Sequence, residues 1–111
     1  MAKDNSLYVD HMLECIERIE EYTIDKEQFT QSRLVQDAVI RNLQILAESS
    51  QRLSDDTKRQ FPEIPWRSIS GFRNILVHDY LGVDLELIWS VVEMELPNLQ
   101  LALLKIQSQR T

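Results

Sequence analysis

The sequence predicts an all-α protein, an antiparallel bundle of four to five helices with no β-sheet. Four segments of the 111-residue chain repeat apolar side chains at the three- and four-residue spacing of a helix that is buried on one face. The chain has 2 glycines and 3 prolines, too few for the frequent turns of a β-sandwich or barrel. No segment alternates apolar and polar residues over the length of a strand. A chain of this length is expected to fold as a single domain, residues 1–111.

The first helix is expected over residues 5–23, where apolar side chains form one stripe and glutamates fill much of the rest. Ser6 or Asp4 is expected to cap its start, because a short side-chain oxygen accepts a hydrogen bond from the free amides of the first turn. His11 lies in this segment and is interpreted as a structural residue at or near the surface. Residues 25–28 are predicted to form a polar connection to the next helix.

The second helix is expected over residues 31–53, capped by Thr30 or Ser32 and apolar around most of its circumference. Such a helix is packed on several sides and takes a central position in the bundle. A single polar stripe interrupts it, formed by Asp37, Arg41, Gln44 and Glu48. Two interpretations stay open for this stripe. Asp37 and Arg41 form an ordinary ion pair four residues apart, or they line a polar site.

The third helix is expected to begin at Pro65, because a proline at the first helical position lacks only an amide that would be unpaired anyway. Residues 54–60 before it are polar and predicted to form one short helical turn at most. The helix is expected to end near Leu81, with Gly82 as its left-handed stop.

The last helix is expected to follow Asp84, whose carboxylate caps its first turn. Pro97 lies inside this helix. A proline there removes one backbone hydrogen bond and clashes with the preceding turn. The helix is therefore expected to kink or break at that point.

Composition and charge restrict where the protein acts. Cys15 is the only cysteine, so the chain has no disulfide within it, and the polar N-terminus has no secretory signal, which together predict a cytoplasmic protein. No uninterrupted apolar run approaches the ~18 residues of a membrane span, so no membrane partner is expected. The net charge is −6, which lacks the basic footprint of an extended nucleic-acid groove. Any binding of nucleic acid must therefore depend on a local cluster or on a partner.

A polar cluster near the end of the third helix is the candidate site. At about 100° per residue, Arg73, Asn74, His78 and Tyr80 share less than half of the circumference. A guanidinium presents a planar fork of donors that matches phosphate oxygens, and an imidazole gains or loses a proton near pH 7. Together they suit metal-free cleavage of RNA, in which a 2′-hydroxyl is activated and charge on phosphorus is stabilised. The neighbouring carboxylates are few, so we expect neither a metal nor another cofactor. From the residues alone, a solvated or capping face stays the alternative.

The spacing of this cluster resembles a known motif. Arg73 and Asn74, three further residues, His78, one residue and Tyr80 match the Arg-x4-6-His motif of the HEPN superfamily with the -x-Tyr extension of its HepT-type toxins. Three flanking segments are also similar to that family, at residues 37–43, 64–72 and 80–84. The resemblance covers about residues 8–97, nearly the whole chain.

The resemblance implies a role for each residue of the motif. Arg73 and His78 would be catalytic, Asn74 would support them, and Tyr80 would be modified with AMP. It also implies a helical bundle that dimerises with the motif at the interface and cleaves RNA as a metal-independent endoribonuclease. The implied partner is an antitoxin, a minimal nucleotidyltransferase of the Mnt type, with which the homodimer would form a larger hetero-oligomer.

Two functions from different classes follow from the sequence. The first is the toxin ribonuclease of a toxin–antitoxin pair, for which a dimer would place two imidazoles in one cleft. The second is a non-catalytic helical adaptor of the same fold that binds a nucleotide or a partner through the face carrying Arg73 and His78. The acidic charge favours the adaptor slightly, since a ribonuclease gains association rate from a basic field. The complete Arg, Asn, His and Tyr set favours the ribonuclease.

Overall fold

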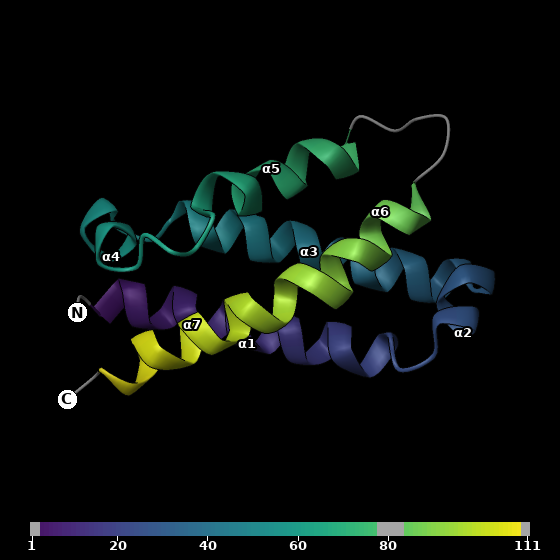
Figure 1. Cartoon of the computed structure of the whole chain (residues 1–111), viewed down its shortest axis with the longest axis horizontal. Coiled ribbons are helices and arrows are strands. Elements are labelled where there is room, and N and C mark those ends of the chain that lie inside the picture. The colour runs from purple at the N-terminus through teal and green to yellow at the C-terminus, as the bar shows by residue number, and fades with distance from the viewer. Residues whose placement is uncertain (1–2, 78–83, 110–111) are drawn as a thin grey trace.

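The structure, a computed structural model, describes residues 3–77 and 84–109, with the side chains of residues 5–72 and 84–109 (Figure 1). Throughout these residues the chain is helical or connects helices, and no strand occurs in them, which confirms the all-α prediction. The elements, in order, are α1 (Lys3–Tyr22), α2 (Lys26–Gln31), α3 (Arg33–Gln51), α4 (Asp55–Gln60), α5 (Trp66–Val77), α6 (Leu85–Ser90), the π-helix η1 (Val91–Glu95) and α7 (Leu96–Ser108).

The long helices pack side by side in an antiparallel bundle. α3 lies between α1 and α5 and packs on both, while α7 packs on α1. α1 begins and α7 ends at one end of the bundle, and α2 lies at the opposite end (Figure 1). The central position predicted for the second long helix is therefore confirmed for α3.

The core lies where α1, α3 and α7 meet. Each contributes side chains that are fully or almost fully buried: Met12, Ile16, Ile19, Leu43, Leu46, Leu103 and Ile106. Complete burial of one such side chain stabilises the fold by about 1.5–3 kcal/mol relative to leaving it in water. These buried side chains hold α1, α3 and α7 together.

Two of the predicted helix caps are confirmed, and the prediction of one connection between helices is wrong. The Ser32 hydroxyl accepts from the amide of Val35 at 3.2 Å, and the Asp84 carboxylate accepts from the amide of Leu87 at 3.1 Å. The polar connection at residues 25–28 belongs instead largely to the short helix α2, which Asp25 caps. α2 forms because it buries Phe29, a gain that depends on tertiary packing.

The predicted start of α1 is also wrong. The helix begins at Lys3, so Asp4 and Ser6 lie inside it. Asn5 is buried, and its amide donates to the Ser54 and Thr57 hydroxyls at 3.0 Å each. Its oxygen accepts from the amide of Ser54 at 3.1 Å. Asn5 thereby fixes the first turn of α4, which is a full helix of six residues capped by Ser54.

The last helix does not break at Pro97, where a kink or break was predicted, and its winding changes just before the proline instead. Helical structure runs without a break from Leu85 to Ser108, but the five residues Val91–Glu95 form a π-helix just before α7. Pro97 has no amide to donate, and its ring would clash with the carbonyl of Glu93 in a regular α-helix. The wider π-turn accommodates the proline, so the helix changes its winding instead of ending.

One described helix, Leu85–Ser108, reaches the length and mean hydropathy, 24 residues and 1.2, of a membrane span. The count of uninterrupted apolar residues missed it because polar residues interrupt the run. Length and composition are the only basis for that classification, and core helices also satisfy it. Here Leu96, Leu99 and Leu103 are buried within the bundle.

Candidate functional site

The structure places the first half of the predicted motif on α5. Arg73 and Asn74 lie in its second half, one and two residues after the buried Phe72. His78 and Tyr80 lie outside the described residues, as does the predicted end of this helix at Leu81 and Gly82. The roles assigned to these side chains therefore stay predictions.

The start of α5 is held in a fixed position. α5 begins at Trp66, one residue after the predicted start at Pro65, and the carbonyl of Pro65 accepts from the amide of Ile69 at 3.1 Å. The indole of Trp66 donates to the carbonyls of Lys58 and Phe61 at 3.2 and 3.1 Å. Ile69 and Phe72 are buried, and their burial fixes the rotation of α5 about its own axis as far as Phe72, the residue before Arg73.

The chain is anchored again directly after residues 78–83. Asp84 caps α6, and Glu86 on α6 pairs with Lys26 on α2 at 3.4 Å. The Lys26 ammonium lies 5.9 Å from the ring centroid of Trp89, and Trp89 contacts Phe29 with 5.4 Å between ring centroids. α6 and α2 therefore form one packed unit at the end of the bundle to which the motif leads.

In the polar stripe on α3, the two residues predicted as possible lining of the site both face solvent. Asp37 and Arg41 are exposed, and α3 packs against α5. Ion pairs among residues 5–72 and 84–109 join Glu14 with Arg18, Lys26 with Glu86 and Asp56 with Arg59. The predicted pair of Asp37 with Arg41 is not among them, because the two side chains extend into water, where such a pair gains little. A lining role for the two residues stays a prediction.

Titratable groups elsewhere in the described part of the chain offer no second reactive centre. His11 is exposed on α1, as predicted. Cys15 is buried, and burial raises the pKa of its thiol above the usual value, against a smaller lowering by the nearby Arg18 guanidinium. Within residues 3–77 and 84–109, no group of three or more His, Cys, Asp or Glu side chains is placed to hold a metal ion.

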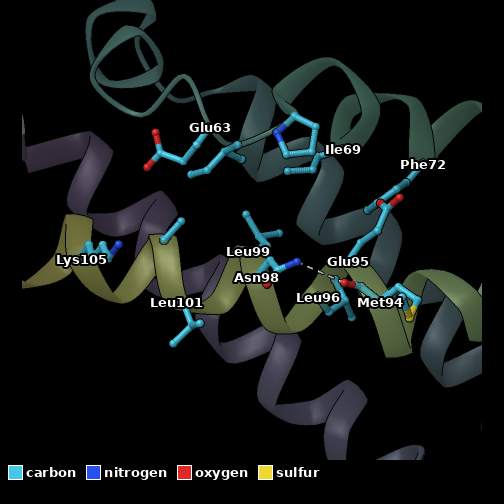
Figure 2. Close-up of a pocket in the computed structure, with 13 residues that line it drawn as sticks. Glu63, Ile69, Phe72, Met94, Glu95, Leu96, Asn98, Leu99, Leu101 and Lys105 are labelled. Carbon is cyan, nitrogen blue, oxygen red and sulfur yellow. Dashed lines mark hydrogen bonds between the residues drawn. The ribbon is translucent and has the colours of Figure 1, made fainter.

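A groove of about 440 Å³ lies between α5 and α7. Ile69 and Phe72 line it from α5, and Leu96 and Leu99 line it from α7, with Met94 at one end (Figure 2). Sequence patterns did not reveal this groove, because it depends on how far apart two helices lie that are both packed on other elements. Phe72, which lines it, directly precedes Arg73 in sequence.

The comparison with protein families decides the classification. The family model described as Ribonuclease HepT-like matches residues 12–106, most of the chain. The chain belongs to this family. The match includes α5 and the whole predicted motif, and it confirms the resemblance on which the motif was assigned.

Individual relatives agree with the family. A γ-glutamylcyclotransferase and putative RNase of Methanocaldococcus jannaschii is 42% identical over 111 residues, 98% of this chain and 50% of the relative. A probable ribonuclease HepT of Thermococcus cleftensis is 40% identical over 102 residues, 90% of this chain and 93% of the relative. This chain thus spans half of the first relative and nearly all of the second.

A solved structure extends the agreement to the fold. The tri-AMPylated HEPN toxin of Shewanella oneidensis, solved in complex with an MNT antitoxin, matches with a TM-score of 0.77 and 25% identity. The match covers 98% of this chain and 100% of that toxin. The predictions of a HepT-type toxin ribonuclease and of its helical fold are confirmed by these matches.

Proposed function

We propose that this HepT-like ribonuclease cleaves RNA without a metal and acts as the toxin of a toxin–antitoxin pair. The observation that carries the proposal is the place of Arg73 and Asn74 on α5, inside the segment that matches the family and next to its fixed, buried face. The exposed His11 on α1 and the buried Cys15 supply no competing nucleophile or base.

The proposed reaction needs one base and one acid. His78 accepts the proton of a ribose 2′-hydroxyl, whose oxygen attacks the adjacent phosphorus and forms a 2′,3′-cyclic phosphate. The bond from phosphorus to the 5′-oxygen breaks, and this oxygen takes a proton from a protonated imidazole. Arg73 stabilises the negative charge of the transition state, and Asn74 donates to the same phosphate.

One chain carries one histidine in this motif, so we propose that the active form is a homodimer. The second copy supplies the second imidazole and a second guanidinium. The pair of motifs also concentrates positive charge on a protein whose chains each carry −6. α5 and the segment through Leu81 then lie near the two-fold axis.

The proposed partner is an antitoxin of the nucleotidyltransferase class, as in the complex of the Shewanella toxin. It transfers AMP from ATP to the Tyr80 oxygen and releases pyrophosphate. The attached phosphodiester brings one negative charge beside the Arg73 guanidinium and occupies the position of the RNA phosphate. The toxin dimer and its antitoxin form a larger hetero-oligomer in the cytoplasm.

The test of catalysis compares the two histidines of the chain. RNA cleavage by the purified protein in EDTA is expected to fall by about 10²–10⁴-fold in His78→Ala. His11→Ala is the matched control, since His11 is exposed on α1, and it is expected to cleave at the wild-type rate. Undiminished cleavage by His78→Ala would disprove the assignment of the base. No cleavage by the wild type would favour a non-catalytic adaptor, which the acidic charge also fits.

The test of regulation compares two tyrosines. Wild type, Tyr80→Phe and the control Tyr22→Phe are incubated with ATP, Mg²⁺ and a nucleotidyltransferase antitoxin of the MNT class. Wild type and Tyr22→Phe are expected to gain the mass of AMP and lose RNA binding and cleavage. Tyr80→Phe is expected to keep its mass and its activity. An equal mass gain in Tyr80→Phe would place the modification on another residue.

A further inference from the structure

Cations gather along one stretch of an otherwise acidic chain. The whole chain has a net charge of −6, yet residues 57–78 have one carboxylate, Glu63, and four cationic side chains, Lys58, Arg59, Arg67 and Arg73. This stretch includes the end of α4, the connection that follows it and all of α5. Arg59 pairs with Asp56, which lies just before the stretch. Lys58 and Arg67 are therefore the two cations of the stretch that lie outside both this pair and the motif.

Two hydrogen bonds of Trp66 hold these two residues at the start of α5. The Trp66 indole donates to the carbonyl of Lys58 at 3.2 Å and to the carbonyl of Phe61 at 3.1 Å, which fixes the last turn of α4 against the first residue of α5. Lys58 is half-buried and Arg67 is exposed. Neither side chain forms an ion pair or a hydrogen bond with any residue of 5–72 or 84–109. We call Lys58 and Arg67 the basic junction.

Stability of the fold does not explain Arg67. The residue lies in the first turn of α5, where the partial positive charge of the helix end repels a cation. No acidic residue lies in that turn to offset the repulsion. The guanidinium keeps its planar fork of donors free, and this fork matches the oxygens of a phosphate.

The register of α5 aligns Arg67 with the motif. Steps of four, three and four residues lead from Arg67 to Gly71, Asn74 and His78. At about 100° per residue these four positions fall in a stripe roughly 60° wide, and Ile69 and Phe72, which are buried, lie on the opposite face. His78 lies outside the described residues, so its place in the stripe is a prediction from the sequence. Arg67 and Asn74 are separated by a rise of about 10 Å along the helix.

Gly71 leaves room between Arg67 and Asn74. A Cβ atom added to Gly71 would meet nothing within 4 Å, and the residue is only half-buried. Packing within the described part of the chain therefore does not require a glycine here, although glycine destabilises the interior of a helix relative to alanine. A glycine does allow another backbone to approach the helix closely.

We propose that an RNA strand runs along this stripe of α5, from the basic junction past Gly71 to the motif. The inference rests on the proposed function, which assigns the scissile phosphate to the motif. Arg67 binds the phosphate of another nucleotide of the same strand, and Lys58 adds a second positive charge beside it. Contacts of this kind position the strand and do not read its base sequence.

The position of the basic junction keeps this path open in the proposed dimer. α5 runs from the end of the bundle that carries α4 toward the end that carries α6 (Figure 1). The basic junction lies at the α4 end, whereas the proposed two-fold axis lies near the motif at the other end of α5. The path also supplies the local cluster of cations that an acidic protein needs to hold RNA.

RNA binding is tested in the His78→Ala protein, which is expected to bind RNA without cutting it. Fluorescence anisotropy is measured with a labelled single strand of about 12 nucleotides. Adding Arg67→Ala is expected to weaken binding by about 10-fold, the effect of one lost charged hydrogen bond. The slope of log K against log salt concentration is expected to become shallower by about 0.7, the value for one phosphate contact on a single strand.

Arg18→Ala is the matched control for the loss of charge. It removes the same charge from α1, and α3 lies between α1 and α5. It is expected to change neither the affinity nor the salt slope. Thermal unfolding is expected to show that Arg67→Ala is as stable as the wild type. Absence of RNA binding, or equal losses of affinity in Arg67→Ala and Arg18→Ala, would overturn the inference.

Substrate length separates this inference from the proposed function. A dinucleoside monophosphate carries only the scissile phosphate, so Arg67→Ala is expected to cleave it as the wild type does. On the longer strand the same variant is expected to raise KM by about 10-fold and to leave kcat unchanged. An unchanged KM on the longer strand would overturn the inference and leave the proposed function intact. A wild type that binds RNA through Arg67 without cleaving it would support the basic junction and overturn the proposed function.

Gly71→Leu tests the close approach of the strand. The leucine side chain enters open space on α5, and leucine favours a helix more than glycine does, so Tm is expected to stay the same or rise. RNA affinity is expected to fall at least as much as in Arg67→Ala, because the side chain then lies in the path of the strand. Sedimentation velocity checks the association state. Unchanged RNA affinity would overturn the path past Gly71, and loss of a dimer would assign this space to the second copy and overturn it as well.

Discussion

Apolar side chains are buried at the contact between α1 and α3, whereas several are exposed along the groove between α5 and α7. Met12, Ile16 and Leu46 of the first region are fully buried within one chain. Met94 and Leu101 of the second expose more than half of their surface. The described part of the chain therefore buries its apolar side chains at the first contact and leaves several of them in water at the second. Substitutions on one side should change the free energy of unfolding, and substitutions on the other should change activity.

The largest effect is expected from Arg73→Ala, which would test this separation from the functional side. Loss of the guanidinium removes a stabiliser of transition-state charge and should slow RNA cleavage by about 10²–10⁴-fold. The sequence places Arg73 on the polar face of α5, so its truncation should leave little cavity. Cleavage rates and thermal unfolding are measured on the same preparation. A fall of several degrees in Tm would show that the two sides are not separate.

Ile16→Ala addresses the other side. Removing three buried carbons at the α1–α3 contact should reduce the free energy of unfolding by about 2–5 kcal/mol, measured in urea. Leu7→Ala on the same helix is the control, because Leu7 is half exposed, and it should change stability by less than about 0.5 kcal/mol. The folded fraction of Ile16→Ala should cleave RNA as the wild type does.

A smaller loss of stability is expected from Asn5→Ala, which removes the buried side-chain amide that joins α1 to α4. The Ser54 amide and the hydroxyls of Ser54 and Thr57 would lose their hydrogen bonds to it. The expected cost is about 1–3 kcal/mol in urea unfolding. Asn98→Ala on α7 is the matched control, since Asn98 is exposed. Equal stability of the two variants would show that the network contributes nothing.

The smallest effect is expected from chemical labelling of Cys15, whose rate of reaction measures how well the α1–α3 contact excludes solvent. Burial raises the pKa of its thiol, so at pH 8 less of it is thiolate than in an exposed cysteine. Reaction with a thiol reagent should be slow in the native protein, accelerate with rising pH and become fast in urea. Rapid labelling of the native protein at pH 7 would show that this side opens readily.

Prediction from sequence succeeded where local chemistry decides. The caps at Ser32 and Asp84 depend on a few neighbouring residues, and the structure confirms them. It failed where the partner is distant. The partners of Asn5 lie 49 and 52 residues away. α2 forms because Phe29 packs against Trp89, and no pattern in the neighbouring sequence predicts this contact. The motif was assigned from its resemblance to a family, the family match confirms that resemblance, and the roles of the motif residues stay predictions.

The π-turn at Val91–Glu95 has a consequence for how this chain tolerates changes of length. It holds about one residue more than an α-helix fits into the same rise, and so sets the phase between α6 and α7. Deleting one residue there would restore regular winding and keep the phase between α6 and α7, whereas deleting one residue from the regular first turns of α7 would rotate α6 by about 100° relative to the rest of α7. Trp89 would then leave Phe29, and the unit formed by α6 and α2 would come apart, although every helix in it had kept its sequence. The phase of one turn thus links the end of the bundle near the motif to the core at the other end.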